Sequence, residues 1–302
     1  MSNQLVSAII VTAGVNGYLG SCLGSLKAQT YPSLEIIVID NTIEHNSVSE
    51  LCRSYPGIRL FSNRKDLLYC EALNKGIAVS SGDFLLCLND DVILERNFVA
   101  EALKGFEIDK KIGMVSGKVL RSDRKTIDST GLFLSIWRTA KERGYGRQDR
   151  GEFESGGYVF GVNGAVAFYR RAMLEQIKKG SSGYFDPAYR IFYEDLDLAW
   201  RAQNRGWRGY YIPKAIAYHT RGGTVRQGKG IDKKYARKYL SEERHYDLIK
   251  NRYLTIVKNE SWFSFFWHLP FIIFYDIFAW GYILFFRPSL IKKFFKKDGD
   301  IL

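Results

Sequence analysis

Four apolar segments at nearly regular intervals constrain the fold of this chain more than any other feature of its sequence. Successive segments begin 28, 24 and 25 residues apart, and helix-like stretches follow the first three. The segments span residues 6–12, 34–40, 58–62 and 83–88. Apolar strands that alternate with helices at this interval are typical of βαβ units, in which the strands form a parallel sheet. The sequence therefore predicts an α/β N-terminal half with a mostly parallel central sheet.

Polar residues follow each of these segments at its carboxyl end. They are Thr12, Asp40 with Asn41, Asn63, and the run Asn89, Asp90 and Asp91. Ligands of open α/β sheets bind at the carboxyl ends of the strands. No segment is followed by a Gly-x-Gly-x-x-Gly fingerprint or by a Walker lysine motif, which argues against dinucleotide-binding and P-loop proteins. A different kind of nucleotide pocket remains.

The run after the fourth segment indicates a metal site. Asn89, Asp90 and Asp91 emerge together at the end of an apolar stretch, FLLCL, that is suited to a buried strand. Such oxygen ligands suit Mg²⁺ or Mn²⁺, which bridge diphosphate oxygens and offset the charge of a leaving nucleotide. An Asx-rich turn that caps a helix beginning near Glu95 is the alternative, and the residues alone leave both open.

The segment 183–202, GYFDPAYRIFYEDLDLAWRA, places an acidic pair at the start of an amphipathic helix. Glu194 and Asp195 follow an aromatic run, and Gly206 ends the helix. Acidic residues in a first turn are favoured by the helix dipole, so the pair is explained by helix stability alone. The alternative is that one of the two carboxylates is a catalytic base.

Six blocks in a fixed order carry a resemblance to a known family. They are VSAIIVT, CLGSLKAQTYPSLEIIVIDN, EALNKGIAVSSGDFLLCLNDDV, VNGAVAFYRRAM, GYFDPAYRIFYEDLDLAWRAQNRGW and IPKAIAYH. In this order and spacing the chain resembles an inverting family-2 glycosyltransferase of the GT-A fold over roughly residues 5 to 260. It is especially similar to the bacterial rhamnosyltransferases that build cell-wall or O-antigen polysaccharide. The resemblance implies a Rossmann-like domain that binds a nucleotide sugar.

The resemblance also implies a donor site. Thr12 and Asp40 would contact the nucleotide base or its ribose, while Asn63 and Asn74 would lie along the nucleotide. Asn89, Asp90 and Asp91 would form the metal-binding element of the DXD type. The donor would be dTDP-rhamnose or a UDP-sugar, and the cofactor Mg²⁺ or Mn²⁺.

The catalytic residues are implied in the same way. Asp195 would be the base that deprotonates the acceptor hydroxyl, with Glu194 beside it. Because the metal-binding element begins with Asn89, Asp91 is the expected direct ligand and Asp90 its support. His219, at the end of an apparent strand, would be a second metal or diphosphate contact, although a structural histidine is the alternative. The acceptor would be a saccharide or a polyprenyl-linked saccharide.

The C-terminal region differs in charge and hydropathy from the rest of the chain. From Arg221 onward there are 16 Lys or Arg against 8 Asp or Glu, so this region holds +8 of the total charge of +12. Residues 262–286 form an aromatic, apolar segment that contains Asp276 and is followed by a KKFFKK run. We expect one or two interfacial helices on an anionic membrane surface. A helix packed on the domain, a homodimer interface and a single span remain alternatives. No readable nucleic-acid-binding motif is present.

Three regions follow from these features: a GT-A catalytic domain over 1–220, a basic loop and long helix over 221–260, and a membrane-associating tail over 261–302. We expect residues 121–157 to be irregular connections. The four cysteines lack a CxxC spacing and fit buried thiols in a reducing compartment. With no signal peptide visible, we expect a peripheral protein on the cytoplasmic face of the inner membrane. A catalytically idle nucleotide-sugar-binding partner in a membrane assembly is the alternative from another class.

Overall fold

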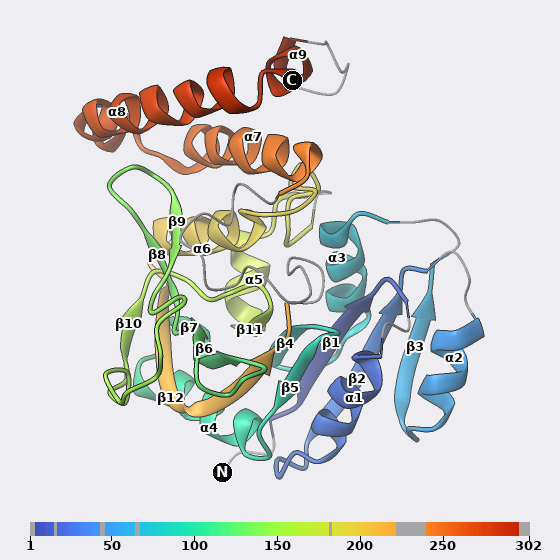
Figure 1. Ribbon diagram of the computed structural model, residues 1–302. Coiled ribbons are helices and arrows are strands. Elements are labelled where there is room, and N and C mark those ends of the chain that lie inside the picture. Colours follow the sequence, from blue (N-terminus) through green and yellow to red (C-terminus); the bar gives the residue numbers. More distant parts are fainter. Residues whose placement is uncertain are drawn as a thin grey trace.

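A mixed β-sheet covered by helices on both faces forms the body of the protein in the computed structural model (Figure 1). The structure describes residues 4–14, 17–42, 46–63, 67–180, 183–221 and 240–295. The strands are β1 (Val6–Thr12), β2 (Leu34–Asp40), β3 (Ile58–Ser62), β4 (Phe84–Asn89), β5 (Val92–Leu94), β6 (Ile112–Arg121), β7 (Ile127–Ser129), β8 (Leu132–Leu134), β9 (Ala140–Glu142), β10 (Gly157–Val159), β11 (Val166–Arg170) and β12 (Arg208–His219). The helices are α1 (Leu19–Lys27), α2 (Asn46–Arg53), α3 (Tyr69–Val79), α4 (Phe98–Ile108), α5 (Arg171–Ile177), α6 (Glu194–Asn204), α7 (Glu242–Asn259), α8 (Trp262–Phe286) and α9 (Ser289–Phe295).

The N-terminal half of the sheet is parallel, as the spacing of the apolar segments predicts. Strand β1 pairs in parallel with β2 and with β4, and β2 pairs in parallel with β3. In this register Thr12 lies opposite Asp40, and Asp40 lies opposite Ser62. The polar residues that follow these strands therefore meet at one edge of the sheet.

Strand β11 reverses the direction of the sheet, because it runs antiparallel to β4 on one side and to β6 on the other. Strand β12 then runs parallel to β6, and the short strands β5 and β10 pair antiparallel with β12. Residues 121–157 are mostly irregular, as expected from the sequence, but they also contain β7 and the β8–β9 hairpin. These three-residue strands are too short to leave an alternating pattern.

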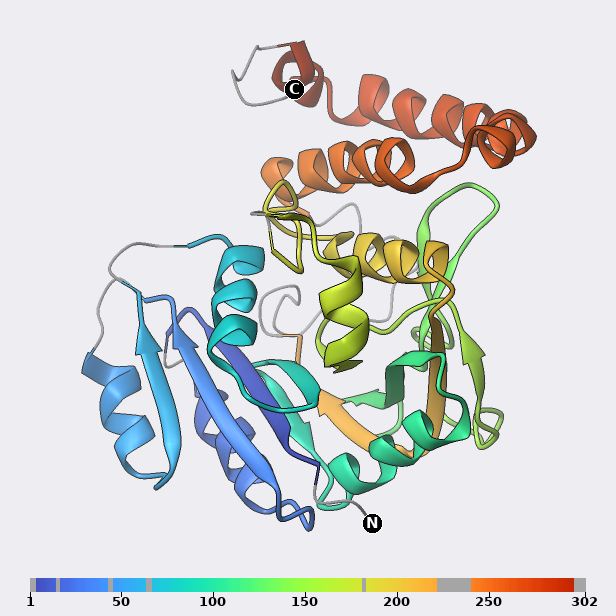
Figure 2. The ribbon, with the colours of Figure 1, turned by 180° about the vertical axis from the view of Figure 1, so that it is seen from behind.

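Two apolar cores lie on the two faces of the sheet. Helices α1, α2 and α4 pack on one face, and helices α3, α5 and α6 pack on the other. The four cysteines are buried within these cores as free thiols, as expected. Figure 2 shows the molecule from behind, with α3, α5 and α6 in front of the sheet. Helix α6 begins with the acidic pair Glu194 and Asp195.

Helices α7 and α8 form a further layer beyond α6. In both views α7 lies between α6 and α8, and α8 runs across α7 on the side away from the sheet (Figures 1 and 2). Two polar contacts hold α8 in place. Arg252 of α7 forms an ion pair with Asp276 at 2.6 Å, and Arg138 in the β8–β9 turn lies 2.8 Å from Nδ1 of His268. The polar side chains of α8 therefore face the protein.

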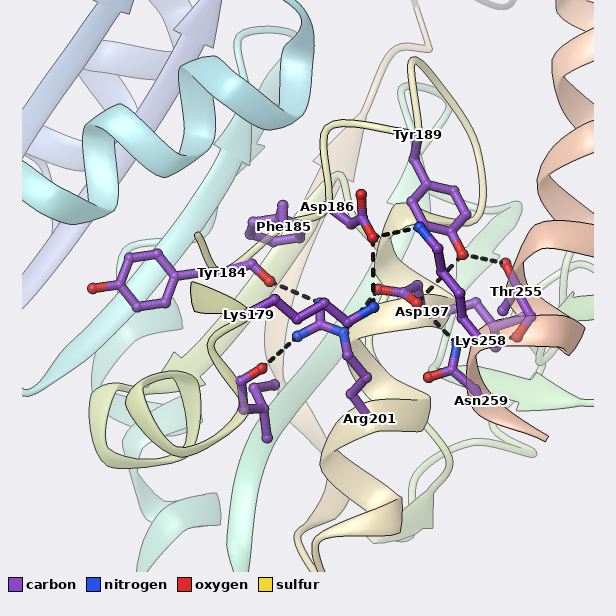
Figure 3. Close-up of polar contacts among 12 residues, drawn as sticks. Lys179, Tyr184, Phe185, Asp186, Tyr189, Asp197, Arg201, Thr255, Lys258 and Asn259 are labelled. Atoms are coloured by element: carbon purple, nitrogen blue, oxygen red, sulfur yellow. Dashed lines mark hydrogen bonds and ion pairs between the residues drawn. The ribbon is translucent and has the colours of Figure 1, made fainter. Parts of the chain in front are cut away.

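A buried polar network ties α6 to α7 and to the aromatic segment that precedes the acidic pair (Figure 3). Arg201 donates to Asp197 at 2.8 Å and to the carbonyl oxygen of Tyr184 at 2.7 Å. Asp197 also accepts a hydrogen bond from Asn259 of α7 at 2.8 Å. The Tyr189 hydroxyl also donates to Asp197 at 3.3 Å. Because Asp197 is fully buried, its carboxyl group depends on these partners in place of water.

We expect Asp197→Ala to lower the free energy of unfolding by about 3–5 kcal/mol, because it leaves the Arg201 guanidinium buried without its counter-ion. Urea denaturation at neutral pH measures the loss. Glu101→Ala is the control, because it breaks an ion pair with the exposed Lys104 that is worth less than about 1 kcal/mol. Equal, small losses in both variants would show that the network does not hold α6 in place.

Candidate active site

A cavity of about 620 Å³ opens at the carboxyl edge of the sheet. Six of the residues predicted from the sequence line it: Asn89, Asp90, Asp91, Glu194, Asp195 and His219. They come from the end of β4, the start of α6 and the end of β12, which are distant in sequence. The structure therefore brings the predicted metal-binding element and the predicted base together in one cavity.

The end of β4 is held in place by side chains from neighbouring elements. The Thr12 hydroxyl donates to Asp90 Oδ2 at 2.7 Å, and the Tyr69 hydroxyl donates to Asn89 Oδ1 at 3.0 Å. Thr12 itself is buried and is not among the cavity-lining residues. The hydrogen bond from Thr12 fixes the Asp90 carboxylate. Asp91 is the second carboxylate that this run contributes to the cavity wall.

Asp40 and Asn63 lie in a polar cluster beside the cavity. Asp40 accepts from the Thr42 hydroxyl at 2.6 Å and from Ser62 at 3.2 Å. Asn63 donates to the side chain of Asn41 at 3.0 Å, and Asn41 lines the cavity. The sequence did not assign a role to Asn41, which follows Asp40 in the chain. The structure places Asn41, and not Asp40, in the cavity lining.

Asn74 lies away from the cavity lining and has main-chain partners. Its side chain accepts from the N–H groups of Tyr184 and Phe185 at 3.0 and 2.8 Å and donates to the Phe185 carbonyl oxygen at 2.7 Å. These bonds connect α3 to the segment that leads to Glu194. The structure thus places Asn74 where it supports that segment.

His219 lies between two carboxylates at the wall of the cavity. Its Nε2 is 3.3 Å from Asp91 Oδ1, and its Nδ1 is 2.8 Å from Asp128 Oδ2. Arg221 forms an ion pair with the other oxygen of Asp128. Burial alone would lower the pKa of His219, but the hydrogen bonds to Asp128 and Asp91 raise it above its ordinary value. Asp128 fixes the orientation of the imidazole, as a carboxylate behind a metal-ligating histidine does.

The donor set of this wall fits a divalent cation that is shared with a diphosphate. Among the described residues there is no group of three or more His, Cys, Asp or Glu arranged to hold a metal by themselves. Mg²⁺ is usually bound by one or two carboxylates together with substrate phosphates. Asp91 supplies such a carboxylate, and His219 places its Nε2 3.3 Å from Asp91 Oδ1. Both residues line a cavity large enough for a ligand.

Glu194 and Asp195 begin α6 directly after a strained piece of backbone. Phe192 and Tyr193 both have left-handed φ values, 68° and 70°, which residues other than glycine rarely adopt. Such conformations concentrate at functional sites, where the surrounding structure enforces them. Here they turn the chain so that both carboxyl groups face the cavity.

The two carboxyl groups of the pair have different environments. Asp195 accepts from the main-chain N–H groups of Gly164 and Leu196 at 3.0 and 2.8 Å, whereas Glu194 Oε2 is buried with no hydrogen-bond partner among the described residues. Burial raises the pKa of both groups, and the charge of Asp195 adds to the rise for Glu194. The main-chain donors favour the charged form of Asp195. Asp195 is therefore the more readily ionised member of the pair.

The turn before β11 and the end of β9 supply further cavity residues. Asn163 and Gly164 belong to a block of small residues, 162–167, that the sequence suggests as a lining of the sugar or acceptor site, whereas Glu142 was not predicted. Gly164 is needed beside Asp195, because a Cβ there would lie 3.3 Å from Asp195 Oδ2. Asn163 donates to Glu142 at 2.6 Å, and both line the cavity. Glu142 stands in a segment expected to be irregular, so only its pairing within the β8–β9 hairpin reveals its position.

The fold and this site agree with the family comparison. The model of the family described as "Glycosyltransferase like family 2" matches residues 3–241. The chain therefore belongs to glycosyltransferase family 2, as its sequence blocks indicated.

Two curated relatives are similar to this chain over part of their length. The poly-beta-1,6-N-acetyl-D-glucosamine synthase of Staphylococcus aureus (strain COL) is 25% identical over 221 residues, which cover 68% of this chain and 48% of the relative. The N-acetylglucosaminyl-diphospho-decaprenol L-rhamnosyltransferase of Mycobacterium tuberculosis (strain CDC 1551 / Oshkosh) is 23% identical over 239 residues, 72% of this chain and 76% of the relative. The chain thus spans about half the length of the synthase.

Among solved structures, the mannosyltransferase PcManGT from Pyrobaculum calidifontis, in complex with GDP-Man and Mn²⁺, has a similar fold. The TM-score is 0.60 at 17% identity, over 97% of this chain and 73% of that one. At this identity the likeness concerns the fold, and it confirms the predicted GT-A architecture.

We expect Glu142→Gln to flatten the pH dependence of stability. Burial raises the pKa of Glu142 from 4.5 to about 8. The folded state therefore keeps a proton that the unfolded state releases, and this contribution to stability is full below the unfolded pKa and is lost as pH rises through the folded one. Between about pH 5 and about pH 8 the wild type should lose about 1 kcal/mol or more relative to the variant, by urea denaturation.

The matched control for this measurement is Glu107→Gln, on the exposed side of α4. Its free energy of unfolding should stay parallel to that of the wild type over the same pH interval. A constant difference between the wild type and Glu142→Gln would contradict the raised pKa of Glu142.

Proposed function

We propose that this protein is a metal-dependent, inverting glycosyltransferase that moves a sugar from a nucleotide-diphosphate donor to a hydroxyl of a saccharide or lipid-linked saccharide. One observation carries the proposal. The Asp195 carboxylate, stabilised by two main-chain N–H groups, and the Asp91–His219 pair line the same cavity at the carboxyl edge of the sheet.

The reaction needs a base because a sugar hydroxyl is a poor nucleophile. The oxygen of the acceptor hydroxyl forms a bond to the anomeric carbon of the donor sugar, and Asp195 takes the proton of that hydroxyl. The bond from that carbon to the diphosphate breaks, and the nucleoside diphosphate leaves with the electron pair. A single displacement of this kind inverts the anomeric configuration.

The wall opposite this chemistry handles the leaving group. Asp91 and His219 would hold Mg²⁺ or Mn²⁺, which supplies positive charge to the diphosphate. Asp128 orients His219 through Nδ1 at 2.8 Å, and Arg221 adds a cation at the edge of the cavity. Thr12, Asp40 and Asn63 would support the nucleotide through their bonds to the ends of β2, β3 and β4.

The donor sugar is proposed from the comparisons. The mycobacterial relative is named as an L-rhamnosyltransferase that acts on N-acetylglucosaminyl-diphospho-decaprenol. We infer that this chain uses dTDP-rhamnose and a polyprenyl-linked acceptor in the synthesis of a bacterial surface polysaccharide. A UDP-hexose is the second candidate donor, since the staphylococcal relative is named as an N-acetyl-glucosamine polymer synthase.

Helix α8 supports attachment to a membrane surface. Among the described residues it is the one helix long and apolar enough to cross a membrane, and only 11% of its most apolar window is buried. Its outward face is aromatic and aliphatic throughout, with exposed residues that recur every three or four positions: Trp262, Phe263, Phe266, Trp267, Phe271, Ile273, Phe274, Ile277, Phe278, Leu284, Phe285 and Phe286. Apolar patches of this extent mark sites of membrane or protein contact.

The contacts of α8 favour a helix that lies in the membrane interface. Asp276 contacts Arg252 of α7, and His268 contacts Arg138 of the β8–β9 turn, so the middle of the helix is held against the protein. These contacts turn the apolar face of the helix outward, as a helix that lies on a membrane surface requires. We propose that residues 1–220 carry out transfer, that 221–260 connect, and that 261–302 dock the enzyme on the anionic cytoplasmic face of the inner membrane.

We expect Asp195→Asn to lower the rate of transfer by about 10²-fold or more, the scale of general-base catalysis, because the amide cannot accept the acceptor proton. Donor affinity should barely change. Release of free nucleoside diphosphate in the presence of donor and acceptor measures the rate. Glu194→Gln is the matched variant and should be less damaging, and the reverse order would mean that Glu194 is the base.

We expect the protein to bind anionic vesicles in a sedimentation assay. High salt should weaken this binding without abolishing it, because the apolar contribution to binding is independent of ionic strength. Replacing Trp262, Phe263 and Trp267 by serine should abolish the salt-resistant part. Tyr158→Ser, an exposed aromatic on β10, is the control. If the chain stays in the supernatant with vesicles at low salt, and analytical ultracentrifugation shows a dimer, the apolar face of α8 would be assigned to a second copy of the chain.

A further inference from the structure

A second cavity lies between α7 and α8 and is lined mainly by aromatic side chains. Its volume is about 470 Å³, and Trp137 of the β8–β9 turn, Tyr253 of α7 and Tyr282 of α8 are among its walls. Its two opposite charges, Arg252 and Asp276, form an ion pair at 2.6 Å and neutralise each other. The cavity is therefore suited to an uncharged, apolar occupant.

This apolar cavity adjoins the active-site cavity. Tyr193 and Leu248 line both of them. Tyr193 stands two residues before Asp195, so the wall that separates the two cavities also carries the proposed base. The apolar cavity therefore begins beside the position that a sugar would occupy at Asp195.

Charge is arranged along this path as an amphipathic ligand would require. Arg244 lines the active-site cavity and lies one helical turn before Leu248 on α7. Arg190, from the segment before α6, lines the same cavity and forms an ion pair with Asp247 at 2.9 Å. Arg244 therefore stands where the polar cavity meets the apolar one, and its guanidinium suits a phosphate at that point.

The far end of the apolar cavity reaches the outward face of α8. Phe274 and Phe278 line the cavity, yet they are 54% and 64% exposed. The cavity is thus continuous with the surface that, in the proposed function, meets the membrane. A hydrocarbon chain that enters from the membrane would not have to cross water to reach the cavity.

We propose that the cavity between α7 and α8 binds the first part of the hydrocarbon chain of a lipid-linked acceptor. The phosphate of the acceptor would lie near Arg244 and its sugar near Asp195. This inference rests on the proposed transferase function and names the substrate class of the same site. It explains why a soluble catalytic fold carries an apolar cavity beside its base.

The kinetic test fills the cavity and compares two acceptors. N-acetylglucosaminyl diphosphate is supplied on a polyprenyl chain or on a butyl chain, with the donor that the wild type accepts. Ala279→Trp places an indole in the cavity, and Ile277→Trp places one on the outward face of the same helix, outside the lining. The ratio of kcat/KM for the polyprenyl acceptor to that for the butyl acceptor should fall about tenfold or more in Ala279→Trp and keep its wild-type value in Ile277→Trp.

An unchanged ratio in a folded Ala279→Trp protein, with an unshifted melting temperature, would overturn the inference and leave the proposed function intact. Absence of nucleoside diphosphate release by the wild type with every donor and both acceptors would overturn the proposed function instead. The two failures are therefore distinguishable.

A binding test on the wild type does not depend on turnover or on folding of a variant. A geranylgeranyl diphosphate that carries a diazirine on its chain is photolysed with the full-length protein, and the labelled peptides are identified by mass spectrometry. Labels should fall within 245–253 and 274–282 and be displaced by geranylgeranyl diphosphate but not by inorganic diphosphate. Labels confined to Trp262, Phe263 and Trp267 would place the chain on the outer face of α8 and contradict the inference.

Discussion

The pairing of β5 with the end of β12 is the constraint on which the site depends. In this antiparallel register Val92 lies opposite His219, so Asp91, one residue earlier, lies beside the imidazole. Strand β7, paired with β6, delivers Asp128 to the other side of the same ring. Two three-residue strands thus set the geometry of a site in which Asp91 and His219 are more than a hundred positions apart. The larger parallel strands provide the edge, and the short antiparallel ones align the side chains on it.

Much of the fold could be predicted from the sequence because it depends on local periodicity. The apolar segments that became β1 to β4 and the helix that begins at Glu194 appear at their expected positions. The strands at 127–142 could not be predicted, because three residues are too few to show alternation and their stability comes from pairing with distant strands. The same reasoning explains the site. Asp91, Glu194, Asp195 and His219 were found from strand ends and a helix start, whereas the position of Glu142 depends on tertiary pairing.

The roles within the predicted residues also follow from contacts that the sequence does not show. Asn74 is polar and near the sheet edge, which is compatible with nucleotide contact, but its amide is engaged by the main chain of Tyr184 and Phe185. Through those bonds and through Arg201, the aromatic segment before α6 is anchored to α3, α6 and α7. This anchoring maintains the left-handed conformations of Phe192 and Tyr193 that aim the acidic pair at the cavity.

Helix α8 connects the site with its surroundings. Its polar residues face inward to Arg252 and Arg138, and its apolar residues face outward or into the aromatic cavity beside Tyr193. One helix therefore faces the catalytic domain with one side and, in our proposal, the membrane with the other. The β8–β9 hairpin joins the two regions, since Glu142 lines the active-site cavity and Trp137 stacks on Phe274 of α8.

The most direct test of the account is calorimetric titration of the donor nucleoside diphosphate into the protein with and without Mn²⁺. The account predicts binding that depends on the metal in the wild type and in Asp195→Asn, and loss of that dependence in Asp91→Ala with the fold retained. Equal, metal-independent binding in all three proteins would contradict the assignment of Asp91 and His219 to the metal.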